Sequence, residues 1–270
     1  MRALWPLAVI TYKEGIRNRA MYGIFLLALL LFAANFLICG MIMQEVGKVA
    51  VDVALSAVSF SGLLLVLFVG INLLAKDLDR RTIYMVLARP ISRGQYIWGK
   101  FFGMAMLIIS AVGCLGGCAL LSIASVRWAF PGYFPRFALG PVVLALLLIA
   151  LMLILLSAVS FLFASFTTSS FVTLILTIIS YFIGHGVAAI KALVEAPETV
   201  GIEVSTATVR LVKGAYYMFP NFSLFDIKIQ AAHNLPVSGT YVAGTLAYGL
   251  IYSALVVTLA GLIFSRREFP

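Results

Sequence analysis

The stretch LGPVVLALLLIALMLILLSAVSFLF, residues 139–163, decides the fold of this chain. It contains no Asp, Glu, Lys or Arg, and nearly every residue in it is apolar. An α-helix needs about 20 consecutive apolar residues to cross the hydrocarbon core of a bilayer. The stretch is long enough for one full crossing, so it predicts a membrane-spanning helix.

Five further stretches satisfy the same criterion, and none of them carries an Asp, Glu, Lys or Arg in its central portion. The fifth span in the chain is interrupted near one end by Gly184, His185 and Gly186. The six predicted spans cover residues 21–43, 53–75, 101–126, 139–163, 171–190 and 241–264. The sequence therefore predicts an all-α integral membrane protein in which residues 1–270 form a single transmembrane domain.

The overall composition agrees with a membrane protein. Hydrophobic residues make up 63% of the chain and charged residues 11%, and the mean hydropathy is +1.11. Such a chain has too little polar surface to cover a water-facing globule. The excess of 19 basic over 10 acidic residues could indicate nucleic-acid binding. The basic residues instead lie in short runs between apolar stretches, so we expect no nucleic-acid partner.

The distribution of Lys and Arg predicts the orientation. With the N-terminus in the cytoplasm, the inner segments are residues 1–20, 76–100, 164–170 and 265–270. These segments hold 12 basic and 4 acidic residues, a net charge of +8, whereas the outer segments have a net charge of +1. Positive charge accumulates on the cytoplasmic side of membrane proteins, which predicts that both termini are cytoplasmic.

Two cytoplasmic segments have a regular pattern. In residues 1–20, apolar residues recur at helical spacing among charged ones, which predicts an amphipathic helix on the membrane surface. In the loop 76–100, residues 77–87 can form a short helix that ends before Pro90. An apolar side on this helix indicates docking against a protein or the membrane. A solvated loop is equally compatible with the pattern.

The outer loop, residues 191–240, is predicted to be structured. Residues 204–219 read as an interfacial helix that Pro220 ends. Ser223 and Asp226 have the spacing of a capping box, which predicts a second short helix reaching about Ala232. Aromatic side chains in this loop are typical of the belt at the outer headgroups. These are Tyr216, Tyr217, Phe219, Phe222 and Phe225.

Several sequence motifs that could indicate nucleotide or metal binding are incomplete or have a simpler explanation. Residues 94–100 match the first seven positions of a phosphate-binding loop, but Phe101 replaces the Ser or Thr that would hold magnesium. We therefore expect no ATP site on this chain. Cys114 and Cys118 share a helix face and could hold a thiophilic metal. The GxxxG spacing of Gly113 and Gly117 favours close helix packing instead.

The remaining candidates for catalysis are two histidines. His185 lies at membrane depth, where an ionisable group is a candidate functional residue, but it has no acidic neighbour in sequence, so a polar packing contact is favoured. His233 has no sequence partner either. With no nucleophile or zinc motif, we expect neither an enzyme nor a metal site. The spans also lack the row of buried carboxylates that ion-coupled carriers need.

Two segments carry a family resemblance. TYKEGIRNR (11–19) resembles the elbow helix of ABC type-2 exporter permeases, in which a Glu and a following Arg recur. KDLDRRTIYMVLARPISRGQYIWGKFFG (76–103) resembles the loop between spans two and three of that family. MFPNFSLFDIK (218–228) and FSRREF (264–269) look like the subgroup associated with multicopper-enzyme maturation. The order of elements resembles the family along nearly the whole chain.

The loop residues match the family position by position. Asp77 and Asp79 match its acidic pair and Thr82 its threonine. Its Pro-x-Ser-Arg turn is matched by Pro90, Ser92 and Arg93, and its Gly-Lys pair by Gly99 and Lys100. Arg81 stands where the family usually has Gly, so the start of the coupling helix can differ.

The resemblance implies a mechanism. Two permease copies would form a dimer in a bacterial inner membrane, above two separate ATPase subunits that bind ATP and magnesium; this chain would hold no cofactor. The implied coupling residues are Glu14, Arg17, Asp77, Asp79, Arg80, Arg81, Thr82, Pro90 and Arg93. The implied outer contacts to a substrate or periplasmic partner are Tyr216, Phe219, Asn221, Phe222 and Phe225. The alternatives are a membrane scaffold or assembly factor for a periplasmic partner, and an ion-coupled carrier.

Overall fold

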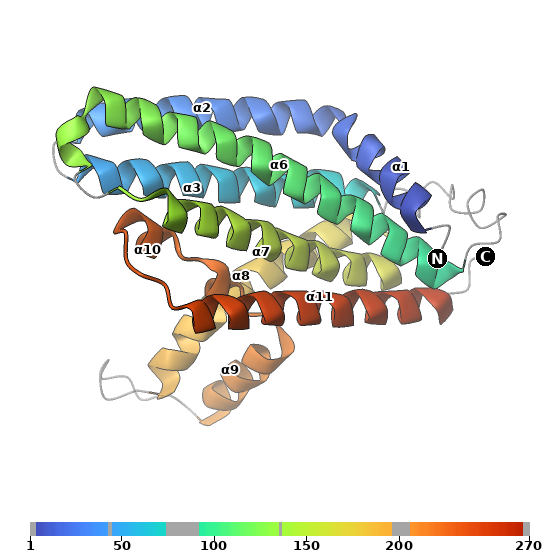
Figure 1. Cartoon of the computed structure of the whole chain (residues 1–270). Coiled ribbons are helices and arrows are strands. Elements are labelled where there is room, and N and C mark those ends of the chain that lie inside the picture. The colour runs from blue at the N-terminus through green and yellow to red at the C-terminus, as the bar shows by residue number, and fades with distance from the viewer. Residues whose placement is uncertain (1–3, 43–44, 74–91, 135–136, 196–205, 267–270) are drawn as a thin grey trace.

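The computed structural model describes residues 4–42, 45–73, 92–134, 137–195 and 206–266, which consist of helices joined by short connections and contain no strand (Figure 1). Within these ranges, 6 helices are long and apolar enough to cross a membrane. They are α2 (Arg19–Met41), α3 (Val46–Leu64) with its continuation to Leu73, α6 (Arg93–Ala129), α7 (Leu139–Phe166), α8 (Ser170–Glu195) and α11 (Gly239–Arg266). The prediction of six spans in an all-α membrane protein is confirmed.

The third span begins earlier than predicted. Ser92 caps the helix: its hydroxyl accepts a hydrogen bond from the Gln95 N–H at 3.3 Å, and the Gln95 side chain accepts one from the Ser92 N–H at 3.2 Å. This capping box starts α6 at Arg93 rather than near residue 101. Residues 93–100 are therefore helical, which corrects the assignment of 76–100 as one loop. At 37 residues, α6 is about 55 Å long, well beyond the hydrocarbon thickness.

The shorter helices also agree largely with those predicted from the sequence. They are α1 (Leu4–Ile16), η2 (Pro131–Tyr133), α9 (Thr206–Met218), η4 (Phe222–Phe225) and α10 (Lys228–Ala232). The helices expected within 1–20 and 204–219 are thus found, and the second outer helix ends at Ala232. The capping box predicted at Ser223 is wrong. Asn221 caps η4 instead, and its side-chain oxygen accepts from the Ser223 N–H at 3.1 Å, a role that Asn fills well.

The end of α3 departs from α-helical geometry. Residues Leu65–Gly70 form a π-helix, η1, before the helix continues to Leu73. The Asn72 side chain donates a hydrogen bond to the Phe68 carbonyl there. π-helical turns are rare and often occur at functional sites, and this one lies three residues before Leu73.

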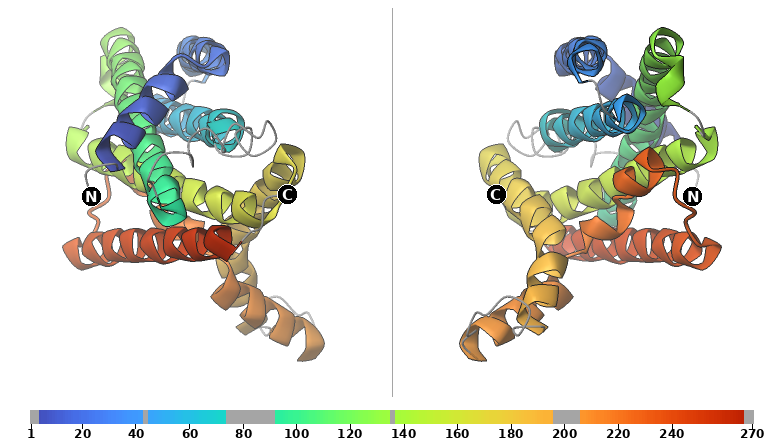
Figure 2. Two further views of the ribbon diagram at one scale, coloured as in Figure 1. Left: turned by 90° about the vertical axis from the view of Figure 1, so that its right-hand side faces the viewer. Right: turned by 90° about the vertical axis from the view of Figure 1, so that its left-hand side faces the viewer.

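The spans form a bundle with both ends of the chain at the same side. The starts of α1 and α6 and the end of α11 lie together at this side in Figure 1, whereas α10 lies at the opposite side. Figure 2 shows α8 leaning away from the other spans, with α9 beside its far end. The chain bends between α1 and α2 at Asn18, whose side chain caps α2 by accepting from the Ala20 N–H at 3.0 Å. This bend lays α1 across α6.

A polar network in the bundle interior joins three spans. The Asn35 side chain on α2 donates to the Ala50 carbonyl on α3 and to Ser122 Oγ on α6, both at 3.1 Å. Ser122 Oγ in turn donates to the Phe32 carbonyl at 3.3 Å. A polar group inside a bilayer is costly unless it is hydrogen-bonded. The network therefore fixes α2, α3 and α6 in one register.

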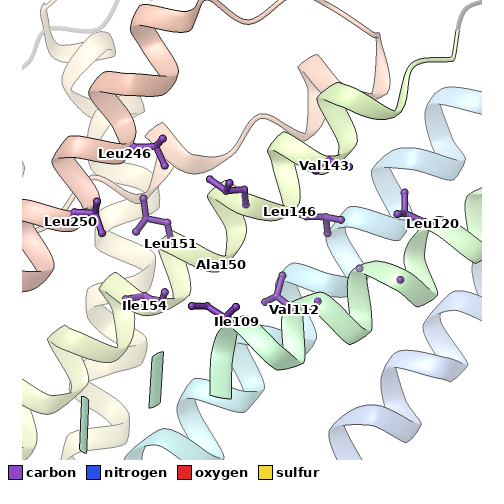
Figure 3. A pocket seen from close by; sticks show the side chains of 14 residues that line it. Ile109, Val112, Leu120, Val143, Leu146, Ala150, Leu151, Ile154, Leu246 and Leu250 are labelled. Atoms are coloured by element: carbon purple, nitrogen blue, oxygen red, sulfur yellow. The ribbon is translucent and has the colours of Figure 1, made fainter. Parts of the chain in front are cut away.

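The glycines of α6 pack differently from the prediction. Gly116 contacts α7, where a Cβ would lie 2.9 Å from Leu146 Cδ1, but a Cβ on Gly113 or Gly117 would meet no heavy atom within 4 Å. Within the described chain, Gly113 and Gly117 do not mediate helix packing, which corrects the GxxxG assignment. They line an apolar groove between α6, α7 and α11 (Figure 3).

Candidate functional site

The crossing of α1 over the start of α6 is the first part of the candidate site. Gly99 and Gly103 lie one turn apart on the face of α6 that meets α1. A Cβ on Gly103 would lie 2.6 Å from the Ala8 carbonyl oxygen and 2.6 Å from Thr11 Cβ. A Cβ on Gly99 would lie 2.6 Å from Leu7 Cδ2. Small residues allow helix backbones to approach closely, so this contact depends on both glycines.

The α1 side of the crossing is equally close-fitting. Gly15 is buried against α6, and a Cβ there would lie 2.5 Å from Leu107 Cδ2. Thr11 is fully buried, and its hydroxyl donates to the Leu7 carbonyl within the same helix at 2.9 Å. This bond satisfies the hydroxyl without a partner on α6. The two helices therefore meet over about two turns, where glycines on each helix face the backbone or a side chain of the other.

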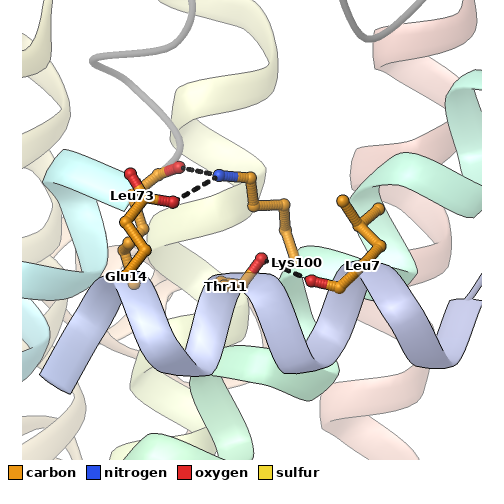
Figure 4. Close-up of polar contacts among 5 residues, drawn as sticks. All are labelled: Leu7, Thr11, Glu14, Leu73 and Lys100. Carbon is orange, nitrogen blue, oxygen red and sulfur yellow. Dashed lines mark hydrogen bonds and ion pairs between the residues drawn. The ribbon is translucent and has the colours of Figure 1, made fainter.

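A buried lysine joins this crossing to the end of α3. The Lys100 ammonium donates to the Leu73 carbonyl at 2.9 Å and lies 3.4 Å from Glu14 Oε2 (Figure 4). It also lies 5.9 Å from the centre of the Tyr96 ring, within range of a cation–π interaction. One charged group thus holds α1, α3 and α6 together.

The two contacts of Lys100 differ in strength. The Glu14 side chain is 50% exposed, and ion pairs with an exposed partner contribute about 0–1 kcal/mol. The bond to the Leu73 carbonyl is buried, and a hydrogen bond from a charged group contributes about 1.5–3 kcal/mol. Of these two contacts, the hydrogen bond to the Leu73 carbonyl is therefore the stronger.

The start of α6 also fixes the end of α11. Arg93 Nη1 donates to the Ser265 carbonyl at 3.2 Å, and the Tyr96 and Phe264 rings stack with centroids 6.1 Å apart. Four segments therefore meet at this end of the bundle: α1, the end of α3, the start of α6 and the end of α11. Residues 74–91 connect two of these segments directly, because the chain leaves from Leu73 and returns at Ser92.

The predicted coupling residues divide into two groups. Glu14 and Arg93 lie at the junction just described, and Arg17 lies exposed just beyond α1. The others fall outside the described residues and stay predictions: Asp77, Asp79, Arg80, Arg81, Thr82 and Pro90.

Sequence reasoning matched Gly99 and Lys100 to the Gly-Lys pair of the family but assigned them no role in holding helices together, and it did not single out Gly103. Lys100 is a charged residue inside a long apolar helix, which is a signal for a functional residue, but its charged neighbours in sequence place it in the loop. Gly99 and Gly103 have the same GxxxG spacing as Gly113 and Gly117. Spacing alone does not reveal which glycine pair faces a helix and which faces an open groove.

The outer residues are arranged differently from the prediction. Asn221, Phe222 and Phe225 are buried by the chain itself. Phe222 stacks on His185 with ring centroids 5.7 Å apart, and Phe225 packs against Tyr248 at 6.3 Å. Their side chains are buried against neighbouring helices, and a role for these three as contacts to a substrate or partner stays a prediction. Tyr216 and Phe219 are half-buried, and their outer role stays a prediction. His185 has the packing role that its sequence context favours.

Gly184 allows this inward turn. A Cβ at Gly184 would overlap the Pro220 carbonyl oxygen and the Phe222 ring. We predict that Gly184→Ala destabilises the protein by about 1–3 kcal/mol, as overpacking does, because a backbone oxygen has no rotamer to escape into. Thermal unfolding in detergent measures this. Gly186→Ala is the matched control, since its nearest neighbour would be Ile190 Cδ1 at 3.9 Å; equal melting temperatures for the two variants would contradict the prediction.

A small cavity with several polar side chains in its lining lies at the end of the bundle opposite the junction. Its volume is about 210 Å³, and Glu45, Lys48, His233 and Asn234 line it. Glu45 and Asn234 have left-handed backbone angles, φ 56° and 53°, a strain that often accompanies function. The hydrogen bond from Lys48 lowers the pKa of the exposed Glu45 carboxyl. The stability that the ionised Glu45 carboxylate contributes is lost as the pH falls through that lowered pKa. Across the described residues, no three His, Cys, Asp or Glu side chains are grouped to hold a metal.

A match to a known protein family covers nearly the whole chain. Residues 5–269 match the family described as ABC-2 family transporter protein. The chain is also similar to the probable ABC transporter permease protein NosY of Stutzerimonas stutzeri, with 26% identity over 128 residues. That alignment covers 46% of this chain and 46% of NosY, so the chain aligns with about half the length of this relative. The family match includes every element of the junction and of the outer segment.

Proposed function

We propose that this chain, which belongs to the ABC-2 transporter family, receives movement from a separate ATPase subunit at the junction of α1, α3 and α6. The chain is a multi-pass membrane subunit of an ABC transporter. One observation carries the proposal: buried Lys100 bonds to the Leu73 carbonyl and to Glu14. Through this lysine, a displacement of either α1 or the end of α3 is passed to α6.

The length of α6 makes it suitable for transmitting movement. It extends from the junction at Arg93 to Ala129 at the far end of the bundle. Closely packed protein interiors shift as rigid units rather than deform continuously. A push on α1 therefore tilts or slides α6, and with it the groove and the outer segment. ATP and magnesium belong to the partner subunit, and this chain contributes no catalytic residue.

Charge supports an ATPase at this end. Lys13, Arg17 and Arg19 are exposed at the end of α1 and the start of α2. Exposed basic side chains meet acidic patches on a partner, which increases the association rate and specificity more than affinity. The excess of basic residues in the inner segments also orients this end toward the cytoplasm. Both termini are then cytoplasmic, in a bacterial inner membrane.

The transporter works as a dimer of this chain with two ATPase subunits and exports or translocates a substrate outward. The family resemblance and the relative named as a permease support this arrangement. The scaffold alternative depended on the outer aromatic residues as a partner surface. Burial of Asn221, Phe222 and Phe225 removes much of that surface, so the transporter is the function we favour.

Co-purification tests the ATPase partnership. The tagged chain, expressed in its native host and solubilised in mild detergent, is expected to bring down a nucleotide-binding subunit. Reversing charge with Lys13→Glu and Arg17→Glu should reduce its recovery about tenfold, because like charges at the contact oppose docking. Lys213→Glu is the matched control, an exposed lysine on α9 at the other end of the bundle. Failure of the unaltered chain to recover an ATPase, or equal losses in all variants, would refute the proposal.

A further inference from the structure

The segment at the end of α9, residues 218–225, follows one stripe of α11 and is named the strap. Three tyrosine side chains of α11 form the stripe. They are Tyr241, Tyr248 and Tyr252. Their spacing of seven and four residues makes the three side chains leave the helix within about 40° of one another.

The outer two tyrosines of the stripe donate hydrogen bonds to main-chain carbonyls of the strap. The Tyr241 hydroxyl donates to the Leu224 carbonyl at 2.7 Å, and the Tyr252 hydroxyl donates to the Met218 carbonyl at 3.1 Å. The strap is therefore bonded to α11 near both of its ends.

The middle tyrosine binds the centre of the strap. The Tyr248 hydroxyl accepts a hydrogen bond from the Asn221 N–H at 3.0 Å, and the Tyr248 ring packs against Phe225 with centroids 6.3 Å apart. All three hydroxyls of the stripe thus bond to main-chain atoms of one segment. Such bonds hold the path of the strap whatever side chains it carries.

The strap also packs on α8. A Cβ on Gly184 would overlap the Pro220 carbonyl oxygen and the Phe222 ring. Phe222 is fully buried, and its ring stacks on His185 with centroids 5.7 Å apart. In the membrane-spanning stretch of α8, 28% of the residues are buried, against 67% in α7. Because α8 leans away from the other spans (Figure 2), the strap is a main tie between its outer half and the bundle.

The strap lies at the depth of the hydrocarbon core. Tyr252 is 14 residues from Arg266 at the junction end of α11, and Gly184 is 14 residues from Ser170 at the start of α8. Fourteen residues of helix measure about 21 Å, which is less than the core thickness of about 30 Å. At this depth a main-chain group finds no water, and leaving it unpaired is costly. The tyrosine hydroxyls satisfy such groups.

We propose that the strap is a clamp that makes α8 follow α11, and that Tyr241, Tyr248 and Tyr252 are its positioning residues. The start of α6 holds the junction end of α11 through Arg93 and Ser265, so a movement of α6 displaces α11. The clamp carries that displacement to the outer half of α8. This last step rests on the proposed function, because the ATPase subunit supplies the movement, whereas the clamp itself rests on the contacts of the strap.

Hydrogen–deuterium exchange of the full chain in lipid nanodiscs tests the clamp without nucleotide. Tyr248→Phe removes the acceptor of the Asn221 N–H, and Tyr252→Phe removes the donor to the Met218 carbonyl. In each variant, exchange in the strap should become about fivefold faster, as expected for one lost hydrogen bond. Exchange in residues 184–195 of α8 should also become faster, although both tyrosines lie on another helix.

Thr258→Val is the matched control on α11. The Thr258 hydroxyl donates to the Ala254 carbonyl of the same helix, so the substitution removes a hydroxyl without removing a bond to the strap. Exchange in the strap and in α8 should stay unchanged. If Tyr252→Phe does not fold, Tyr241→Phe serves in its place. Its effect should be smaller, because Tyr241 lies nearer the outer end of α11, where water can replace the lost bond.

The co-purified complex with its ATPase subunit tests whether the clamp carries movement. A non-hydrolysable ATP analogue should change exchange in residues 184–195 of the unaltered chain. The variant Tyr248→Phe with Tyr252→Phe should lose most of this change while it recovers the same amount of ATPase, because the strap lies far from the junction. A full nucleotide response in this variant would show that α8 does not receive its movement through the strap.

Two results without nucleotide would overturn the clamp. Unchanged exchange in α8 in both tyrosine variants would mean that α8 and the strap move separately. Equal acceleration by Thr258→Val would mean that loss of any hydroxyl loosens α11. Failure to recover an ATPase subunit refutes the proposed function alone, since the exchange measured without nucleotide still decides whether the clamp exists.

Discussion

Replacing Gly103 with alanine is expected to detach α1 from α6. The new Cβ would lie 2.6 Å from the backbone carbonyl oxygen of Ala8 and 2.6 Å from Thr11 Cβ. No rotamer change moves a backbone oxygen, so the whole helix must shift. Overpacking of this kind costs about 1–3 kcal/mol. We expect a lower melting temperature in detergent and, under the proposed partnership with an ATPase subunit, loss of stimulated ATP hydrolysis by the complex.

Alanine substitutions at two further glycines should have smaller effects on stability than Gly103→Ala. Gly99→Ala meets the Leu7 side chain, which can rotate, so its effect should be smaller. Gly113→Ala, on the same helix and in open space, should leave both stability and stimulation unchanged. Measured melting temperatures should therefore fall in the order Gly113→Ala, Gly99→Ala, Gly103→Ala. An unchanged melting temperature for Gly103→Ala would mean that α1 does not pack as described.

Lys100→Met is expected to separate the end of α3 from the other two helices. Methionine keeps a similar length and apolar stem but donates no hydrogen bond to the Leu73 carbonyl, which the lysine reaches at 2.9 Å. A buried hydrogen bond from a charged group is worth about 1.5–3 kcal/mol. We expect that loss in the free energy of unfolding, and a decrease of at least about tenfold in ATPase stimulation at unchanged ATPase binding.

Glu14→Gln provides the matched comparison. The Glu14 side chain is half exposed, so removing its charge should cost no more than about 1 kcal/mol. A double-mutant cycle between Glu14→Gln and Lys100→Met isolates the energy of their ion pair. If Glu14→Gln costs as much as Lys100→Met, then Lys100 is held by the carboxylate and not by the backbone carbonyl of α3.

The spans could be predicted from the sequence because a bilayer crossing is a local property. A run such as residues 139–163 is apolar over the required length whatever surrounds it. The start of α6 could not be predicted in the same way, because Lys100 and Arg93 suggest a water-facing loop. In the structure, Lys100 instead donates a hydrogen bond to a carbonyl of the helix that continues α3 and forms an ion pair with Glu14 from α1. Those partners are distant in sequence, so no local pattern indicates them.

The candidate site was only partly predictable for the same reason. Family resemblance located Glu14 and Arg93, but the glycine pair that packs depends on which face of α6 meets a neighbour. The outer aromatic residues show the converse error. Phe222 and Phe225 have the composition of a membrane-interface belt, yet the missing side chain at Gly184 lets their segment turn into the bundle.

The acceptor for Lys100 is a main-chain atom, and this has a consequence for how the family can diverge. Any residue at position 73 supplies the same carbonyl, so its side chain can change over evolution without a compensating change at position 100. A comparison of correlated substitutions would find no signal between these two positions despite their 2.9 Å contact. The constraint should appear instead as a one-sided demand for a cation at position 100, and as intolerance of single-residue insertions or deletions in η1, which would rotate the carbonyl out of reach.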